Sequence, residues 1–71
     1  MDPDANLKEQ ADFNLLAMSL FDKRRLRELR FALQEWLTSG GFPPNWKAHS
    51  VATKAFHAWQ RKMVKFGDLV R

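Results

Sequence analysis

The chain contains no cysteine, and this absence removes three kinds of chemistry. Without thiols it can form no disulfide, no thiolate metal site and no cysteine nucleophile. The same absence leaves the redox state of its compartment open. Tyrosine is also absent and β-branched residues are few, which argues against β-strands, because strands favour these side chains.

A long hydrophobic run is lacking as well. The longest mostly apolar stretch, residues 13–21, is interrupted by Asn14 and Ser19 and is far too short to span a bilayer. The first residues are acidic, whereas a secretory signal starts with a basic region. We therefore expect a soluble, intracellular protein, cytoplasmic if its source is bacterial or viral, with no membrane association.

The chain is too short for most catalytic architectures. Its 71 residues suffice for one domain, residues 1–71, and leave no room for a second. A chain of this size buries roughly 60% of the surface that its unfolded form exposes. So thin a core cannot also enclose a substrate pocket on the order of hundreds of Å³. We expect a protein that is not an enzyme and carries no cofactor.

Glycine and proline number only three each, and four of these six residues lie in positions 40–44. This cluster is the one clear break in the chain, and Gly40 or Gly41 suits the residue that follows a helix. No repeat or strand-like alternation is present. We predict an all-α, compact three-helix bundle-like domain. Its helices span about residues 3–20, 23–38 and 46–66, with residues 39–45 as the loop between the second and third.

Capping residues indicate where each helix begins. Asp2 is a good N-cap, with Pro3 at the first helical position. Asp22 is the expected N-cap of the second helix. Asn45 is the expected N-cap of the third helix, and Ser50 is the alternative.

Apolar residues recur at helical spacing and define the expected core. The second helix carries one stripe, made of Leu26, Leu29, Leu33, Trp36 and Leu37. The third carries a broad face, made of Ala48, Val51, Ala52, Ala55, Phe56, Trp59, Met63 and Phe66. The first carries two stripes, one of Leu7, Ala11, Leu15 and Met18 and one of Phe13, Leu16 and Leu20. One stripe suffices for packing, so the second can extend the core or meet a partner.

Charge is distributed unevenly along the chain, whose net charge is +4. Residues 1–22 hold five acids against Lys8, a net charge of −4. Residues 23–37 hold five bases against two acids, and residues 38–71 hold six bases against Asp68, giving +3 and +5. A basic body behind an acidic start predicts an anionic partner, or an acidic helix that packs on the basic ones. A merely solvated surface is the simpler explanation.

The strongest candidate for phosphate binding is the basic run at the start of the second helix. Its members are Lys23, Arg24, Arg25, Arg27 and Arg30. Free backbone N–H groups at a helix start, together with adjacent cations, make a good anion site. The competing interpretation is that the acidic first segment neutralises the run and that Arg24 and Arg25 pair with Glu28.

A second basic patch follows the outer side of the third helix. Its members are Lys54, Arg61, Lys62 and Lys65, and no acid occurs between Glu35 and Asp68. Such a stripe can track a phosphate backbone independently of base sequence. Phe56 and Trp59 fall on the buried side of this helix, so they are not expected to stack on bases.

Six apolar residues are candidates for a protein interface. They are Phe13, Leu16, Leu20, Phe31, Phe42 and Trp46. Phe31 faces away from the apolar stripe of its helix, among charged neighbours, and is hard to bury in a three-helix domain. Aromatic residues next to arginines are enriched at interface hot spots. Phe42 and Trp46 are more simply explained as a cover over one end of the bundle.

Catalytic and metal-binding patterns find little support. The two histidines, His49 and His57, are eight residues apart, so they cannot chelate a metal from one helix face. Ser50 lies two turns from His57, roughly 10 Å away along the helix axis, which is beyond proton-transfer reach. The glycine pair lacks the lysine and Ser/Thr of a phosphate loop. We expect no catalytic residue and no metal site.

These patterns together predict a small, non-catalytic binding module that contacts nucleic-acid phosphates, in DNA or RNA, through its basic helix surfaces. The alternative is a protein-interaction adaptor that binds an acidic protein or a second copy of itself through the exposed apolar residues of its first two helices. The first predicts that affinity falls steeply with salt, and the second predicts an oligomer or a protein complex.

Overall fold

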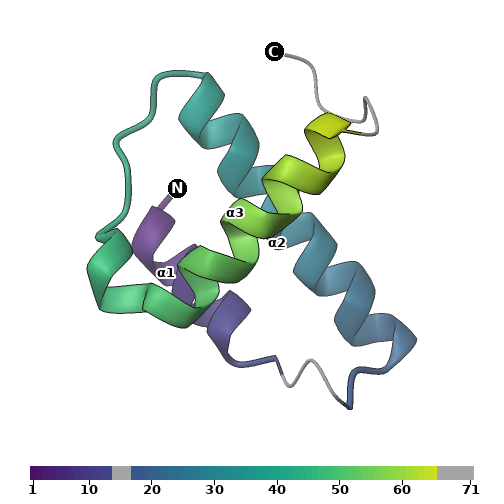
Figure 1. Cartoon of the computed structure of the whole chain (residues 1–71). Helices are drawn as coiled ribbons and strands as arrows, with labels where there is room; N and C mark the ends of the chain where they lie inside the picture. Colours follow the sequence, from purple (N-terminus) through teal and green to yellow (C-terminus); the bar gives the residue numbers. More distant parts are fainter. Residues whose placement is uncertain (14–16, 66–71) are drawn as a thin grey trace.

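A computed structural model describes residues 1–13 and 17–65, the last of these by its backbone alone. Within these ranges the chain forms three α-helices and one short 3-10 helix and has no strand (Figure 1). They are α1 (Pro3–Ala11), α2 (Leu20–Thr38), η1 (Trp46–His49) and α3 (Ser50–Lys65). The predicted all-α, three-helix architecture is confirmed, although two of the predicted boundaries are wrong. The predicted roles of Leu15, Leu16, Phe66 and the Lys65 side chain lie outside the described residues.

Helix α1 begins as its sequence predicts but ends much earlier. The Asp2 carboxylate accepts hydrogen bonds from the backbone N–H groups of Asp4 and Ala5, at 3.0 and 3.2 Å, and Pro3 follows it. The helix stops at Ala11, so the predicted continuation to residue 20 is wrong. Apolar spacing alone suggested the longer helix, whereas Ser19 is extended (φ −74°, ψ 172°) and caps a new one.

Helix α2 begins three residues before the prediction. Ser19 is its N-cap, and its hydroxyl accepts from the Asp22 N–H at 3.2 Å. The Asp22 carboxylate in turn accepts from the Ser19 N–H at 3.2 Å, which completes a capping box. Asp22 is therefore not the N-cap. The Asp22 N–H bonds to the Ser19 hydroxyl and the Lys23 N–H bonds to the Ser19 carbonyl at 3.1 Å, so these two groups are not free for the predicted anion site.

The end of α2 is closed by the two glycines. Gly40 adopts a left-handed conformation (φ 89°), and its N–H bonds to the Leu37 carbonyl at 3.3 Å. The Gly41 N–H bonds to the Trp36 carbonyl at 2.9 Å, which completes a Schellman motif. A Cβ at Gly41 would clash with the Trp36 ring, so a larger residue would have to displace this ring. The Trp36 indole also donates to the Phe42 carbonyl at 2.8 Å, which holds the loop against the helix.

The third helical segment uses both of its predicted starting points. Asn45 caps the 3-10 turn η1 through an Ala48 N–H bond of 3.4 Å, and α3 continues from Ser50. The Asp4 carboxylate ties this turn to the start of α1. It accepts from the Asn45 N–H at 2.8 Å and lies 3.2 Å from the His49 imidazole.

The core gathers residues from all three helices. Leu7, Leu33, Ala52, Phe56 and Trp59 form its central cluster, and Leu26 and Leu29 are also buried. Phe56 is fully buried and stacks between Trp46 and Trp59, with ring centroids 6.1 and 5.7 Å away. The apolar stripe predicted for the second helix is confirmed at Leu26, Leu29 and Leu33.

Two predicted faces differ from those in the structure. Phe31 is not turned away from the core, because α3 crosses α2 and brings Trp59 against it, edge to face, with centroids 4.9 Å apart (Figure 1). The buried face of the third helical segment is narrower than predicted, since Ala48 of η1 is exposed and Val51 of α3 is 77% exposed. None of the helices in the described ranges is long and apolar enough to cross a membrane.

Candidate nucleic-acid interface

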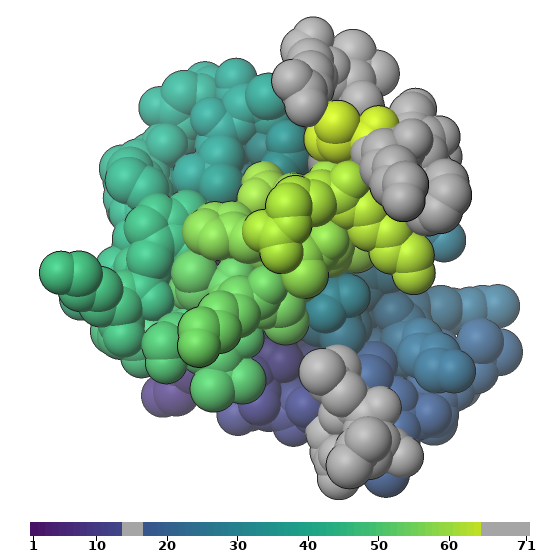
Figure 2. All heavy atoms as spheres, in the orientation of Figure 1, coloured from purple at the N-terminus to yellow at the C-terminus, as the bar shows by residue number. Residues whose placement is uncertain are grey.

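A groove of about 440 Å³ lies between the first half of α2 and the second half of α3. Figure 2 shows the green and yellow atoms of α3 directly beside the blue atoms of this part of α2. The groove is lined by Met18, Lys23, Leu26, Arg27, Arg30, Trp59 and Met63. Its lining therefore combines three cations with an apolar floor. No carboxylate is among its described lining residues.

Helical spacing explains why α2 brings three bases to one groove. Lys23, Arg27 and Arg30 follow at intervals of four and three residues, so they share one face of the helix. They span roughly 10 Å along the helix axis. The Arg27 guanidinium lies over the Phe31 ring, 5.5 Å from its centroid, and this contact positions its charge beside the groove. None of these three bases has an ion-pair partner within the described part of the chain.

Lys62 adds a cation from the α3 side. It is exposed and lies seven residues after Ala55, so the two residues nearly eclipse along α3. Ala55 lines a smaller cavity next to the groove, which places Lys62 on the same side of α3. Lys62 is thus on the side of α3 that faces this smaller cavity, but it does not line the groove itself.

Arg25 faces the other way and is neutralised. Its guanidinium makes two hydrogen bonds to the Glu9 carboxylate, at 2.6 and 3.0 Å, and lies 3.6 Å from Glu28. The hydrogen bond from Arg25 lowers the pKa of Glu9, and the same bond raises the pKa of Arg25. The predicted neutralisation of the basic run by the acidic first segment is therefore confirmed for Arg25. The predicted ion pair with Glu28 is also confirmed for Arg25, but not for Arg24, within the described residues.

The Glu9–Arg25 pair predicts a loss of stability in acid. Because the pKa of Glu9 is lowered from 4.5 in the folded protein, the pair stabilises the fold above that value. This stabilisation disappears as the pH falls through the lower, folded-state pKa. We expect Glu9→Gln to remove this part of the acid sensitivity, as measured by thermal unfolding at a series of acidic pH values. Equal acid sensitivity of the variant and the wild-type protein would contradict the assignment.

The remaining predicted bases lie apart from the groove. Arg24, Lys54 and Arg61 are exposed and do not line it. Lys54 and Arg61 are seven residues apart and so share an outward face of α3. The structure thus divides the predicted basic residues into a groove set, a neutralised arginine and an outward set.

The predicted apolar interface is rearranged. Because α1 ends at Ala11, Phe13 and Leu20 do not form a helical stripe. Phe13 is half-buried, and Trp46 is half-buried against Phe56, which agrees with its interpretation as a cover. Leu20 and Phe42 remain 67% and 61% exposed.

Sequence reasoning missed the most exposed large aromatic residue in the described part of the chain, Phe21, at 85%. The signal that would have found it is the capping box at Ser19 and Asp22. This box starts the helix at Leu20 and so sets which side of the first turn faces solvent.

Neither a metal-binding cluster in the described residues nor a similarity to known proteins points to another site. Among residues 1–13 and 17–64, no group of three or more histidine or acidic side chains is placed to hold a metal ion. Comparisons with models of known protein families, with curated proteins and with solved structures found no match. Any function must therefore be argued from the geometry of the surface.

Proposed function

We propose that this protein is a non-catalytic module that binds the phosphate backbone of DNA or RNA in the groove between α2 and α3. One observation carries the proposal. Lys23, Arg27 and Arg30 line a single groove without an ion-pair partner among the described residues, while Arg25 on the same helix is paired with Glu9. A cationic face without carboxylates attracts a polyanion, because binding releases the counterions condensed on the phosphates.

The length of the cationic face suits contacts to more than one phosphate. Its three cations extend roughly 10 Å along α2, over which a nucleic-acid strand presents more than one phosphate. Lys62 of α3 supplies a fourth cation for the same strand. Such contacts position a backbone without reading its bases, so we expect little sequence preference.

The proposal predicts a steep dependence of affinity on salt. With four phosphate contacts, raising the salt from about 50 to about 200 mM weakens binding roughly 50- to 150-fold. We expect fluorescence anisotropy to show this for labelled duplex DNA, single-stranded DNA or RNA. The Arg27→Gln variant is expected to reduce the slope of log affinity against log salt by roughly one contact, about 0.7 to 0.9.

Two matched variants test where the strand lies. Arg25→Gln removes the same charge from the neutralised side of α2, and Arg61→Gln removes it from the outward face of α3. We expect both to change the salt slope less than Arg27→Gln does. If no nucleic acid binds even at low salt, the proposed function is wrong, and equal effects of all three variants would refute the groove as its location.

A second candidate function is self-association, and the exposure of Leu20 and Phe21 at the start of α2 favours it. Two adjacent large apolar side chains, 67% and 85% exposed, suit an interface between copies. Sedimentation equilibrium would then show a dimer that Phe21→Ser dissociates and Phe42→Ser does not. A monomer at high concentration would remove this candidate. Phe31, which the sequence suggested as an interface residue, is not used in this test, because its ring packs on Trp59.

A further inference from the structure

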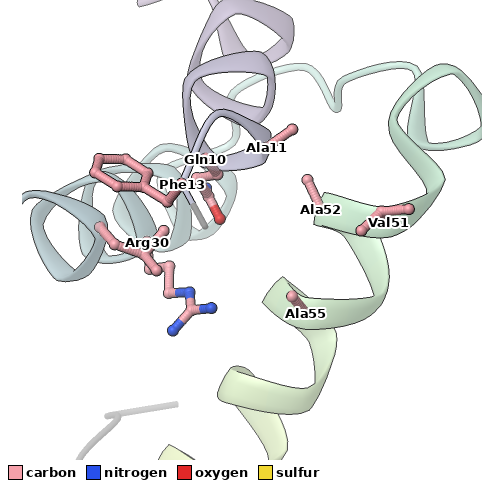
Figure 3. Close-up of a pocket in the computed structure, with 8 residues that line it drawn as sticks. Gln10, Ala11, Phe13, Arg30, Val51, Ala52 and Ala55 are labelled. Carbon is pink, nitrogen blue, oxygen red and sulfur yellow. The ribbon is translucent and has the colours of Figure 1, made fainter. Parts of the chain in front are cut away.

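A narrow cavity of about 40 Å³ lies behind the groove, where the three helices meet. It shares Leu26 and Arg30 with the groove, so the two spaces adjoin. Figure 3 shows Gln10 of α1 and Arg30 of α2 extending into the space that α3 borders with Ala52 and Ala55. The rest of its lining is apolar, which leaves these two side chains as its polar groups.

The orientation of Gln10 is set by its neighbours. The Asn6 amide nitrogen donates to the Leu29 carbonyl at 3.0 Å, so the Asn6 amide oxygen is free to accept. The Gln10 amide nitrogen donates to that oxygen at 2.7 Å. Because the Gln10 amide nitrogen is used in this way, the amide oxygen, Oε1, is the polar atom of the side chain that is left to bind another group. Gln10 is only 6% exposed, and no described protein group donates to Oε1.

Arg30 supplies the complementary group. Its Nε is buried and has no acceptor among the described residues. Burial lowers the pKa of Arg30, because the guanidinium is removed from water without a nearby carboxylate. A buried acceptor and a buried cationic donor, both without a partner, therefore line one cavity. Leaving such groups unsatisfied is costly, and a ligand that pairs with both is stabilised.

We propose that this cavity holds the terminal phosphate of a nucleic-acid strand that lies in the groove. The inference rests on the proposed function and specifies that the groove binds strand ends. Arg30 donates to the phosphate oxygens, and the Gln10 oxygen accepts from the protonated oxygen of the same phosphate. Lys23 and Arg27 then bind the phosphates that follow along the strand.

Two properties distinguish a terminal phosphate from an internal one. An internal phosphodiester carries two sugars, so it cannot enter a narrow cavity end-on, whereas a terminal phosphomonoester carries one. A diester also has no proton to donate, and its oxygens would face the Gln10 oxygen unfavourably. A monoester has a second pKa of about 6, so it can present one O–H to Gln10 and charged oxygens to Arg30.

The first test compares strand ends on the wild-type protein at about pH 6. Three otherwise identical single strands carry a 5′-phosphate, a 3′-phosphate or hydroxyl groups at both ends. A fourth strand ends in hydroxyl groups but is one nucleotide longer, which supplies an extra backbone charge. We expect one of the phosphorylated strands to bind about tenfold more tightly than both hydroxyl strands in anisotropy titrations.

The second test removes the acceptor. Gln10→Met keeps the length of the side chain, and we expect it to reduce the preference for the phosphorylated end to within about twofold. Its affinity for the hydroxyl strands should stay the same. Gln34→Met is the matched control, because Gln34 also makes an amide–amide hydrogen bond, to Gln60 of α3, but lies outside the cavity. The control should retain the full preference.

A measurement on the unaltered protein covers the case in which Gln10→Met fails to fold. The Arg30 Nε–H signal, assigned by its loss in Arg30→Lys, can be followed by NMR. We expect it to shift further with the phosphorylated strand than with the hydroxyl strands, because only a terminal phosphate reaches the buried Nε in the cavity. Equal shifts with all strands, or equal affinity for all four strands, would overturn the inference and leave the proposed function intact. Failure of every strand to bind would refute both.

Discussion

The Phe56→Ala variant is expected to melt at least about 12 °C below the wild-type protein. Phe56 is fully buried and stacks between the rings of Trp46 and Trp59. Truncating a buried phenylalanine costs about 3 to 5 kcal/mol, through lost burial and the cavity left behind. A 71-residue domain has a total stability of roughly 4 to 11 kcal/mol, so this loss is a large part of the whole.

Thermal and urea unfolding followed by circular dichroism would measure this effect. In a domain of this size each 1 kcal/mol lowers Tm by about 4 to 8 °C. Val51→Ala is the matched control on the same helix, because Val51 is 77% exposed, and it should stay within about 0.5 kcal/mol of wild type. Similar losses in the two variants would show that Phe56 is not the centre of the core.

The Asn6→Asp variant is expected to be destabilised by about 3 to 5 kcal/mol at neutral pH. Asn6 is 7% exposed, and its amide nitrogen donates to the Leu29 carbonyl at 3.0 Å. An ionised carboxylate there would place a negative oxygen against that carbonyl, in surroundings with little water. The change adds almost no volume, so electrostatics alone accounts for the loss.

The pH dependence of this variant has a definite sign. Burial raises the pKa of the introduced carboxyl above its unfolded value of about 3.9. Below that value both states are protonated, and the carboxyl O–H can donate to Leu29 as the amide did. The variant should therefore lose stability as the pH rises above about 4, until it passes the raised folded-state pKa. The wild-type protein should show the opposite slope in acid, because the pKa of Glu9 is lowered.

Urea unfolding at a series of pH values would test this contrast. Asn45→Asp is the control, since Asn45 is exposed and aspartate is an equally good helix cap. It should lose far less stability at neutral pH than Asn6→Asp, even though the Asn45 N–H bonds to the Asp4 carboxylate. An Asn6→Asp protein that is equally stable at neutral and acidic pH would contradict the burial of this polar relay.

Local signals explain the parts of the fold that could be predicted. Asp2 and Pro3 start α1, and Gly40 ends α2, because capping depends on residues within one turn of each other. The end of α1 was missed because its apolar spacing continues past Ala11. The start of α2 was misplaced because the reciprocal pair of Ser19 and Asp22, which begins this helix at Leu20, was overlooked.

The candidate interface was predictable only in part, for a different reason. The basic run on α2 and the bases of α3 can be read directly from the chain. Arg25 is neutralised because α1 brings Glu9, sixteen residues earlier in the chain, beside α2. Arg27 has no such partner among the described residues. Likewise, Phe31 is sheltered by Trp59 of α3, a contact that no helical wheel of α2 reveals.

The all-α class, the number of helices, most of their caps and the excess of positive charge can be predicted without a structure, because each depends on composition or on neighbours within a few residues. The packing of the helices determines which charges stay unpaired, where the groove lies and why Gln10 and Arg30 share a cavity. These features arise where α1, α2 and α3 meet. The crossing of the helices is set by packing between residues far apart in the chain.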